Sequence, residues 1–259
     1  MELNGSPVRP EHLEVLALTN YGHFTSMLVE GGRVRGLHLH LRRLAGDCRA
    51  LFGVELDEER VRDHLRRVVS DVDCPVVARV TIHDPALDLG SIGADAEPAV
   101  LVTTRPAPRG APAPLRLRSV PHRREEPSIK HVGLFGAMRH RRLARRAGFD
   151  DVLFRNLDGT VSELATSNIG FVRGDRIVWP RAEVLPGVTM ALLRDALGEP
   201  DVEEPLTLAD LAGTEAAFAT NAATGIRPIR SADDVVWPTA HPGLTELRER
   251  YEEIPGEAV

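Results

Sequence analysis

A proline-rich segment near the middle of the chain constrains its fold more than any other feature. Between residues 105 and 114 the chain carries Pro106, Pro108, Gly110, Pro112 and Pro114. Proline lacks a backbone N–H and fixes its own φ angle, so this run cannot continue a helix or a central strand. We therefore predict an N-terminal domain over residues 1–104, an interdomain linker over 105–114 and a C-terminal domain over 115–259.

The bulk composition indicates a globular protein with a substantial core. Of 259 residues, 42% are hydrophobic and 27% are charged, and the net charge of −6 argues against nucleic acid as the main partner. No stretch approaches the ~18 apolar residues of a membrane span, and the N-terminus lacks an apolar segment. We therefore expect a cytoplasmic protein that does not bind a membrane. Cys48 and Cys74 are too few to indicate a disulfide framework or a metal site.

The N-terminal part alternates strand-like and helix-like patterns, which is typical of an α+β domain whose helices cover one side of a sheet. The predicted strands cover residues 13–18, 24–30, 76–82 and 99–104. A hairpin turn is expected at Gly31-Gly32. A helix is predicted over residues 37–52, because apolar residues recur on one face: Leu37, Leu41, Leu44, Cys48 and Leu51. A second helix is expected to run from an N-cap at Asp57 to about Asp71.

The C-terminal part is rich in short strands joined by turns. The predicted strands cover residues 115–120, 151–155, 160–164, 169–172, 177–179, 216–220 and 226–229. Helices are predicted over residues 134–147, 188–197 and 244–251. The first of these helices carries many arginines, which we interpret as a solvated face. Its inward stripe is supplied by Leu134, Met138 and Leu143.

Lys130 is the only lysine among 32 lysines and arginines. A guanidinium group stays protonated in proteins, whereas a desolvated lysine amine can lose its proton and attack a carbonyl carbon. Where arginine replaces lysine almost everywhere, the exception marks a position that requires amine chemistry. The alternative is a surface lysine that survived by chance. The flanking sequence Pro127-Ser128-Ile129-Lys130-His131 favours the chemical role, because an apolar residue precedes the lysine and a helix follows.

Five short motifs in the C-terminal part occur in an order that resembles a known family. They are Ile129-Lys130, Gly148-Phe149-Asp150-Asp151-Val152-Leu153, Gly159-Thr160-Val161-Ser162-Glu163, Ser167-Asn168-Ile169-Gly170-Phe171-Val172 and Leu185-Pro186-Gly187-Val188-Thr189. The N-terminal part adds Tyr21-Gly22 and His40-Leu41-Arg42-Arg43-Leu44. Together they resemble the class IV, or fold-type IV, pyridoxal-phosphate-dependent aminotransferase family. That family includes branched-chain and D-amino-acid aminotransferases, (R)-amine transaminases and 4-amino-4-deoxychorismate lyase.

The resemblance implies a fold and an assembly. The expected fold class is α+β, with a smaller N-terminal α/β domain and a larger, cofactor-binding C-terminal domain that contains a mixed, barrel-like sheet. Pyridoxal 5'-phosphate is expected in the cleft between the two domains. The enzyme is expected to be a homodimer with its active site near the interface.

The motif matches imply roles in cofactor chemistry. Lys130 matches the lysine that forms the internal aldimine and carries the proton between substrate and cofactor carbons. Glu163 matches the glutamate that pairs with the pyridine nitrogen, where a carboxylate favours the protonated ring, the better acceptor of carbanion charge. Arg43 matches the phosphate-binding arginine. Arg42 lies about 100° away on the helix and is expected to be solvated.

The cofactor is expected to have further partners in the C-terminal domain. A helix that starts at Val188 and Thr189 presents free backbone N–H groups, which suit an anion such as phosphate. The resemblance also assigns four more residues to the cofactor site: Ser167, Asn168, Asn221 and Ala222.

Four residues are expected to contact the substrate: Tyr21, Thr25, Arg79 and Phe135. Tyr21 and Thr25 lie in a segment that is shorter than in many family members, which alters the substrate wall. Arg79 suits the capture of a substrate carboxylate, and a structural ion pair is an equal alternative. Phe135 stands where many aminotransferases carry a tyrosine that hydrogen-bonds the cofactor, and phenylalanine cannot donate such a bond.

The expected reaction is transamination between an amino donor, either an amino acid or an amine, and a 2-oxo acid acceptor. Elimination from 4-amino-4-deoxychorismate is the alternative within the same chemistry, because the compact N-terminal domain and Thr220-Asn221 also resemble that lyase. A third possibility is a protein that binds the cofactor but has little transaminase activity, in keeping with Phe135 and the shortened segment.

Overall fold

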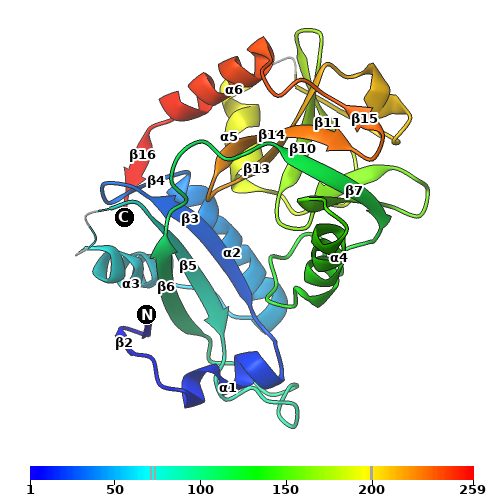
Figure 1. Ribbon diagram of the computed structural model, residues 1–259. Helices are drawn as coiled ribbons and strands as arrows, with labels where there is room; N and C mark the ends of the chain where they lie inside the picture. Colours follow the sequence, from blue (N-terminus) through cyan, green and yellow to red (C-terminus); the bar gives the residue numbers. More distant parts are fainter. Residues whose placement is uncertain (71, 73, 199–200) are drawn as a thin grey trace. The chain divides into compact units, whose positions relative to one another are not determined.

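The computed structural model describes residues 1–70, 72, 74–198 and 201–259, which form two compact units (Figure 1). Unit 1 comprises Met1–Ala107, Ile129–Gly133 and Gly256–Val259, and unit 2 comprises Pro108–Ser128 and Leu134–Pro255. By its contacts, Lys130 therefore belongs to unit 1, although it follows the proline-rich segment in the chain. The domain boundaries at residues 105–114 remain a prediction, because a compact unit need not fold alone.

Unit 1 is built on a five-stranded antiparallel sheet with the strand order β2-β1-β6-β5-β3. The strands are β1 (Glu2–Leu3), β2 (Ser6–Pro7), β3 (His23–Val29), β5 (Val76–His83) and β6 (Ala99–Pro106). The last three confirm the strands predicted near residues 24–30, 76–82 and 99–104. A separate ribbon pairs β4 (Arg33–Arg35), which follows the predicted Gly31-Gly32 turn, with β16 (Gly256–Ala258) near the end of the chain.

Two helices, α2 (Leu37–Phe52) and α3 (Glu58–Val69), pack their apolar residues onto this sheet (Figure 1). Asp57 accepts a hydrogen bond of 3.1 Å from the Arg60 N–H, so it is the predicted N-cap of α3. The predicted end of that helix at Asp71 lies outside the described residues. Even α2, with 16 residues, is too short and too polar to cross a membrane, and the same holds for every other helix that the structure describes.

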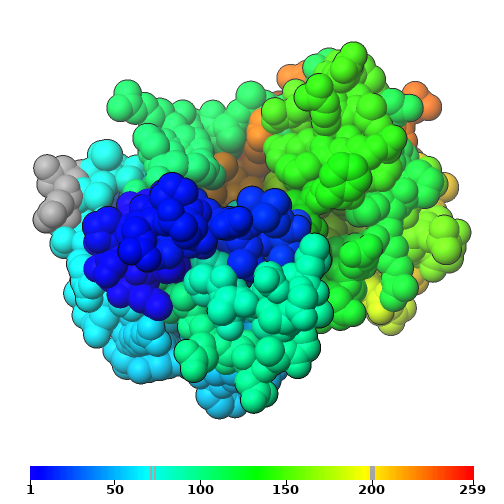
Figure 2. All heavy atoms as spheres, turned by 90° about the horizontal axis from the view of Figure 1, so that it is seen from below, coloured from blue at the N-terminus to red at the C-terminus, as the bar shows by residue number. Residues whose placement is uncertain are grey.

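The strand predicted at residues 13–18 is wrong, because this segment lies in helix α1 (Glu11–Leu18). Leucine, glutamate and alanine all favour helix, and the helical spacing of Leu13 and Leu16 brings both side chains against an apolar cluster on β1 and β6. In Figure 2 the N-terminal segment (blue) lies on the surface of unit 1 beside the segment that links β5 to β6 (blue-green). Tertiary packing decides the conformation here, because the apolar run itself fits either structure.

Unit 2 contains a nine-stranded mixed sheet in which six strands close into a barrel-like ring. The ring strands are β7 (Leu115–Pro121), β8 (Asp151–Arg155), β9 (Val161–Leu164), β10 (Asn168–Arg173), β13 (Ala216–Asn221) and β14 (Gly225–Ala232). The remaining strands are β11 (Arg176–Pro180), β12 (Asp201–Glu204) and β15 (Val235–Val236). One core cluster takes apolar side chains from all six ring strands, so it fills the ring.

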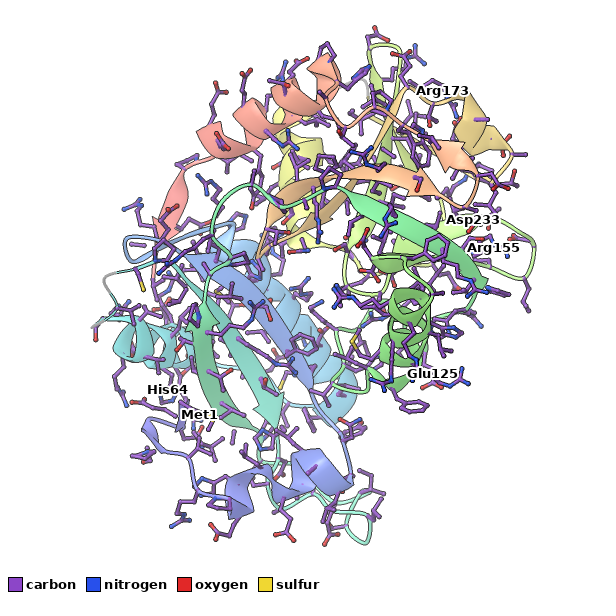
Figure 3. The ribbon with its side chains drawn as sticks, viewed as in Figure 1. Met1, His64, Glu125, Arg155, Arg173 and Asp233 are labelled. Atoms are coloured by element: carbon purple, nitrogen blue, oxygen red, sulfur yellow. The ribbon has the colours of Figure 1, made fainter. Side chains whose placement is uncertain are left out.

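Polar side chains tie neighbouring parts of the ring together. The Ser119 N–H on β7 donates a 2.9 Å hydrogen bond to Asp233 Oδ1, and Arg155 Nε donates to Ser119 Oγ at 3.2 Å. Figure 3 labels Arg155 and Asp233, which lie on the same side of unit 2. The closed ring of six strands confirms the mixed, barrel-like sheet expected for the C-terminal part.

Three α-helices cover unit 2: α4 (Phe135–Arg146), α5 (Val188–Leu197) and α6 (Pro242–Glu253), with a short 3-10 helix η1 at Asp210–Gly213. A second core cluster joins α5 and α6 to the sheet through Trp179, Phe218 and Leu244. On α4 the predicted inward stripe is partly wrong. Met138 packs inward, but Leu143 is 46% exposed, and Ala144 takes the buried position beside β8.

Leu41→Ala should lower the free energy of unfolding by roughly 2–5 kcal/mol, because Leu41 is fully buried in the core of unit 1. Leu18→Ala makes the same chemical change at the exposed end of α1 and should cost less than about 1 kcal/mol. Urea unfolding followed by circular dichroism measures both values. Equal losses for the two variants would contradict the packing of α2 against the sheet.

Candidate active site

Lys130 is held in unit 1 by main-chain hydrogen bonds. Its carbonyl oxygen accepts from the Phe24 N–H at 2.9 Å, and its own N–H donates to Asp47 Oδ2 at 3.1 Å. The side chain of Lys130 lies over Phe24, with Nζ 5.0 Å from the centre of the ring. Strand β3 and helix α2 thus fix the backbone of the lysine.

Gly22 takes part in this attachment through its carbonyl group. The Val132 N–H donates to the Gly22 carbonyl at 2.9 Å, beside the Lys130–Phe24 bond. Gly22 has a φ angle of 151°, and a Cβ atom at this position would lie 2.7 Å from the Ile82 carbonyl oxygen. Only glycine fits such an approach of two backbones. The Tyr21-Gly22 motif therefore has a structural reason: glycine lets the chain pass close to the end of β5 at the point where it also accepts the Val132 N–H.

A second cation lies on the Phe24 ring. The guanidinium carbon of Arg79 is 3.5 Å from the ring centre, and Arg79 Nε donates to Thr81 Oγ1 at 3.1 Å. Burial lowers the pKa of Arg79 from its ordinary value, although a guanidinium remains protonated. The structure thus brings Arg79 and Lys130 to one aromatic ring, which gives this part of unit 1 a positive potential suited to a carboxylate.

Arg43 and Thr25 meet on the same face of unit 1. Arg43 Nη2 donates to Thr25 Oγ1 at 2.6 Å, and Thr25 Oγ1 lies 2.6 Å from His40 Nδ1. Complete burial lowers the pKa of His40 well below its ordinary value, and the charges of Arg43 and Lys130 lower it further. Burial, with a smaller effect of Arg43, lowers the pKa of His23 to about 3. Both histidines are therefore neutral at ordinary pH.

Two of the expected substrate residues have other surroundings. The Tyr21 hydroxyl donates to the Leu51 carbonyl at 2.8 Å, and its ring packs edge-on against Phe52 with centroids 5.5 Å apart. That hydroxyl is therefore engaged with the end of α2. In unit 2, Phe135 is the first residue of α4 and is 79% exposed. The substrate roles of these two residues remain predictions.

Glu163 is buried on β9 in unit 2, with only 5% of its surface exposed. The Leu185 N–H donates to its Oε2 at 3.4 Å, and Arg124 Nη1 lies 4.0 Å from its Oε1. Both contacts are long. A buried carboxylate held in this way suits a cationic partner such as a protonated ring nitrogen.

Asn168 fixes the segment that leads from Leu185 into α5. It lies opposite Glu163 where β10 pairs with β9, and its Nδ2 donates to the Leu185 carbonyl at 2.8 Å. A Cβ atom at position 187 would lie 1.9 Å from Asn168 Oδ1, so Gly187 is required. The side-chain amide of Asn168 thus connects the surroundings of Glu163 to the start of the helix.

The start of α5 fits a phosphate group. Gly187 is its N-cap, no described side chain caps the first N–H groups, and the first turn carries no acidic residue. Two buried hydroxyls of unit 2, on Thr189 and Thr220, have no hydrogen-bond partner among the described residues. A helix N-terminus without its own cap, together with unpaired hydroxyls, is the donor set that a bound phosphate requires.

The loop after β13 is shaped by Asn221. Its Nδ2 donates to Ser167 Oγ at 3.0 Å, and its Oδ1 accepts from the N–H groups of Ala223 and Thr224 at 3.0 and 3.1 Å. Ala222 is half-buried at the tip of this turn. Asn221 and Ser167, both predicted to bind the cofactor, are thereby in contact with each other, and the Asn221 side chain holds the loop.

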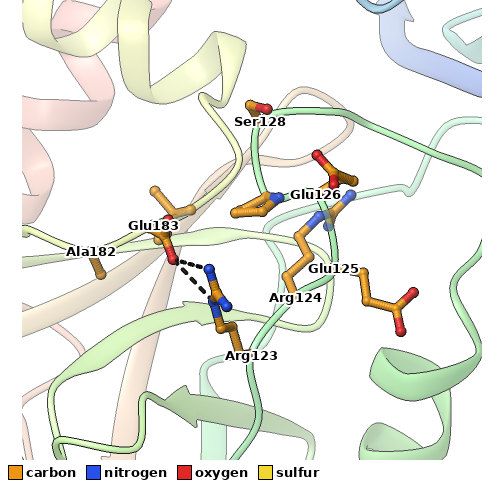
Figure 4. Close-up of a pocket in the computed structure, with 9 residues that line it drawn as sticks. Arg123, Arg124, Glu125, Glu126, Ser128, Ala182 and Glu183 are labelled. Carbon is orange, nitrogen blue, oxygen red and sulfur yellow. Dashed lines mark hydrogen bonds and ion pairs between the residues drawn. The ribbon is translucent and has the colours of Figure 1, made fainter. Parts of the chain in front are cut away.

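Unit 2 contains a cavity of about 630 Å³ (Figure 4). It is lined by residues 123–128 and 182–184. At one side Arg123 Nη2 and Glu183 Oε2 form an ion pair of 2.8 Å, drawn with dashed lines in Figure 4. Arg124, the partner of Glu163, also lines the cavity. The strongly charged lining suits a small polar ligand rather than an apolar one.

Two contacts of the site are not predicted from the sequence. Asp47 binds the Lys130 N–H, and the one signal for it is an acidic residue within the apolar stripe of α2, next to Cys48. The sequence carries no local signal for the ion pair between Arg124 and Glu163, because Arg124 follows β7 and Glu163 lies on β9. The structure does separate Arg42 from Arg43 as expected, since Arg42 is exposed and Arg43 half-buried.

Comparisons with known proteins agree with the fold and with these motifs. The profile of the family Amino-transferase class IV matches residues 22–232. A probable branched-chain-amino-acid aminotransferase of Rickettsia bellii (strain RML369-C) is 26% identical over 250 residues, which covers 89% of this chain and 86% of that protein.

Solved structures show the same architecture. A branched-chain aminotransferase from the thermophilic archaeon Thermoproteus uzoniensis has a TM-score of 0.85 at 21% identity, covering 97% of this chain and 92% of that chain. A 4-amino-4-deoxychorismate lyase from Pseudomonas aeruginosa has a TM-score of 0.79 at 25% identity, covering 97% and 98%. Because the family profile matches most of the chain, this protein belongs to the class IV aminotransferase family and is a pyridoxal-phosphate-dependent enzyme of the fold-type IV architecture.

Proposed function

We propose that this enzyme transfers an amino group between an amino acid or amine and a 2-oxo acid, with Lys130 as its catalytic amine. The observation that carries the proposal is the placement of the only lysine. Its main chain is fixed by Phe24 and Asp47, and its amine lies over an aromatic ring. A fixed backbone brings the amine to a defined place, which suits a group that must bind a carbonyl carbon and then move a proton.

The family resemblance assigns several residues to the cofactor. When bound, pyridoxal 5'-phosphate supplies an electron sink for negative charge at the substrate carbon. Lys130 Nζ would hold the cofactor covalently and, when released, accept the proton from that carbon. The Glu163 carboxylate would keep the proton on the ring nitrogen, and Arg124 favours the ionised state of that carboxylate. Arg43 and the N–H groups at the start of α5 would bind the phosphate.

The substrate side of the site is suited to carboxylates. Arg79 is the candidate for a substrate carboxylate, because its half-buried guanidinium retains donors beyond the bond to Thr81. Amino acids and 2-oxo acids both carry such a group. We also propose that the enzyme is a homodimer, which rests on the family resemblance.

Elimination from 4-amino-4-deoxychorismate is the second candidate. It is favoured by the match to the Pseudomonas aeruginosa lyase, which covers 97% of this chain and 98% of that one, so the two chains have nearly the same extent. The same lysine and glutamate would serve either reaction. Analysis of products from an amino acid with a 2-oxo acid, and from 4-amino-4-deoxychorismate, separates the two candidates.

Lys130 should retain the cofactor covalently. Borohydride reduction of the holoenzyme followed by peptide mapping should place the label on Lys130 alone. Lys130→Arg should keep the positive charge but retain no label, because a guanidinium is not a usable nucleophile here. The only other aliphatic amine of the chain is its N-terminus. A label there, or no label with cofactor bound, would rule out the proposed role of Lys130.

Glu163→Gln should slow deprotonation of the substrate carbon by about one to two decades, because a charged hydrogen-bond partner is worth roughly 1.5–3 kcal/mol. Single-turnover absorbance measurements at saturating substrate give this rate. Glu246→Gln on α6 is the matched control, since Glu246 is exposed and pairs only with Arg250 in the described structure. Equal rates in wild type and Glu163→Gln would show that Glu163 is not the partner of the ring nitrogen.

Arg43→Ala should weaken pyridoxal 5'-phosphate binding to the apoenzyme by about one to two decades, through the loss of a charged contact worth roughly 1.5–3 kcal/mol. Arg42→Ala removes the same group from the next residue and should cost far less, because Arg42 is exposed to solvent. Titration of the two apo-variants measures both affinities. A larger loss in Arg42→Ala would show that the phosphate is bound by the other arginine.

A further inference from the structure

Two hydrogen bonds link three side chains of unit 1 in a row, and the proposed reaction does not itself require them. Arg43 Nη2 and His40 Nδ1 both lie 2.6 Å from Thr25 Oγ1. His40 and Arg43 are three residues apart on α2, so one face of the helix presents both of them to β3. Thr25 and His40 have no exposed surface.

The direction of each hydrogen bond follows from the chemistry of the groups. A guanidinium can only donate, so the Thr25 oxygen accepts from Arg43. The hydroxyl then has one proton to give, and its other neighbour in the described structure is His40 Nδ1. A neutral ring whose Nδ1–H donates to Thr25 Oγ1 would fit the same contact, but the Thr25 proton would then have no partner in the described structure, so we assign the tautomer in which Nδ1 accepts and Nε2 carries the proton. Each partner therefore has one role in this chain of bonds.

This arrangement fixes the hydroxyl of Thr25 in rotation. A free hydroxyl can turn its lone pairs in several directions, whereas this one must point its proton at His40. A lone pair of Thr25 Oγ1 then faces Arg43, and the guanidinium is held through its Nη2 group. The long side chain of arginine has a large rotamer entropy, about 2 kcal/mol when it is fully free. A fixed acceptor reduces the part of that entropy that is lost when an anion binds.

We propose that Thr25 and His40 are positioning residues that orient the Arg43 guanidinium toward the cofactor phosphate. This inference rests on the proposed function, in which Arg43 binds that phosphate. It replaces the expectation that Thr25 lines the substrate mouth, because the Thr25 hydroxyl is fully buried and both of its bonds stay inside unit 1. The His-x-x-Arg spacing on α2 thereby acquires a physical reason.

The test uses Thr25→Val, which keeps the shape of the side chain but removes the hydroxyl, and Thr25→Ser, which keeps the hydroxyl. Each apoenzyme is titrated with pyridoxal 5'-phosphate and with pyridoxal, which lacks the phosphate. Thr25→Val should weaken binding of the phosphorylated probe by about tenfold and leave pyridoxal binding unchanged. Thr25→Ser should bind both probes as the wild type does. A general loss of packing would weaken both probes alike and overturn the proposal.

A double-mutant cycle separates this inference from the function on which it rests. In the Arg43→Ala background, Thr25→Val should have no further effect on pyridoxal 5'-phosphate affinity, because the residue it orients is absent. Additive losses would overturn the positioning role while leaving the phosphate role of Arg43 intact. If Arg43→Ala alone changes neither affinity, the phosphate role itself is wrong.

His40 offers a second, independent pair of variants. His40→Asn keeps a hydrogen-bond acceptor close to the position of Nδ1. The leucine side chain of His40→Leu has as many heavy atoms as asparagine but offers no acceptor. The two variants leave similar space in the core, so a difference between them reports the hydrogen bond. His40→Leu should lose about tenfold in affinity for the phosphorylated probe only, and His40→Asn should recover most of it. Equal affinities of the two variants would overturn the part assigned to His40.

Discussion

The backbone pairing of residues 130–132 with the start of β3 is the interaction on which the proposed chemistry of this enzyme depends. Two hydrogen bonds, from Phe24 to Lys130 and from Val132 to Gly22, attach a segment from beyond the proline-rich linker to the sheet of unit 1. Without them the only lysine would lie on a connection between strands. With them its amine lies over the Phe24 ring, which the guanidinium of Arg79 also contacts. The absence of a side chain at Gly22 lets the same part of the chain pass close to the end of β5.

The pairing of β9 with β10 has the corresponding role in unit 2. It closes six strands into a ring and places Asn168 opposite Glu163. From there the Asn168 amide binds the Leu185 carbonyl, and the Leu185 N–H turns toward Glu163. One short segment thereby connects a buried carboxylate to the N-terminus of α5. The polar groups that fit the ring nitrogen and the phosphate are thus held by a single network rather than by separate loops.

Local sequence patterns predicted most elements of both units. The apolar stripe of α2 and the Asp57 cap, for example, depend only on residues that are close together in the sequence. The segment at residues 13–18 shows where such patterns fail. An apolar run of this length suits a strand or a helix, and the cluster on β1 and β6 decides between them. The inward position predicted for Leu143 is wrong for a similar reason, because Ala144 is the residue that packs against β8. Both outcomes depend on neighbours that are distant in the chain.

The sequence by itself determined that this protein is a class IV aminotransferase with one usable lysine, because motif order and residue type are properties of the chain alone. Helix geometry also indicated that Arg42 and Arg43 face different ways, and the family resemblance assigned Arg43 to the cofactor side. Only the tertiary structure decided that Lys130 packs with unit 1, that Arg124 lies beside Glu163, and that the Thr25 hydroxyl is enclosed between His40 and Arg43. These contacts join residues on different elements, and hydrogen bonds act over about 3 Å, so no local pattern in the sequence specifies them.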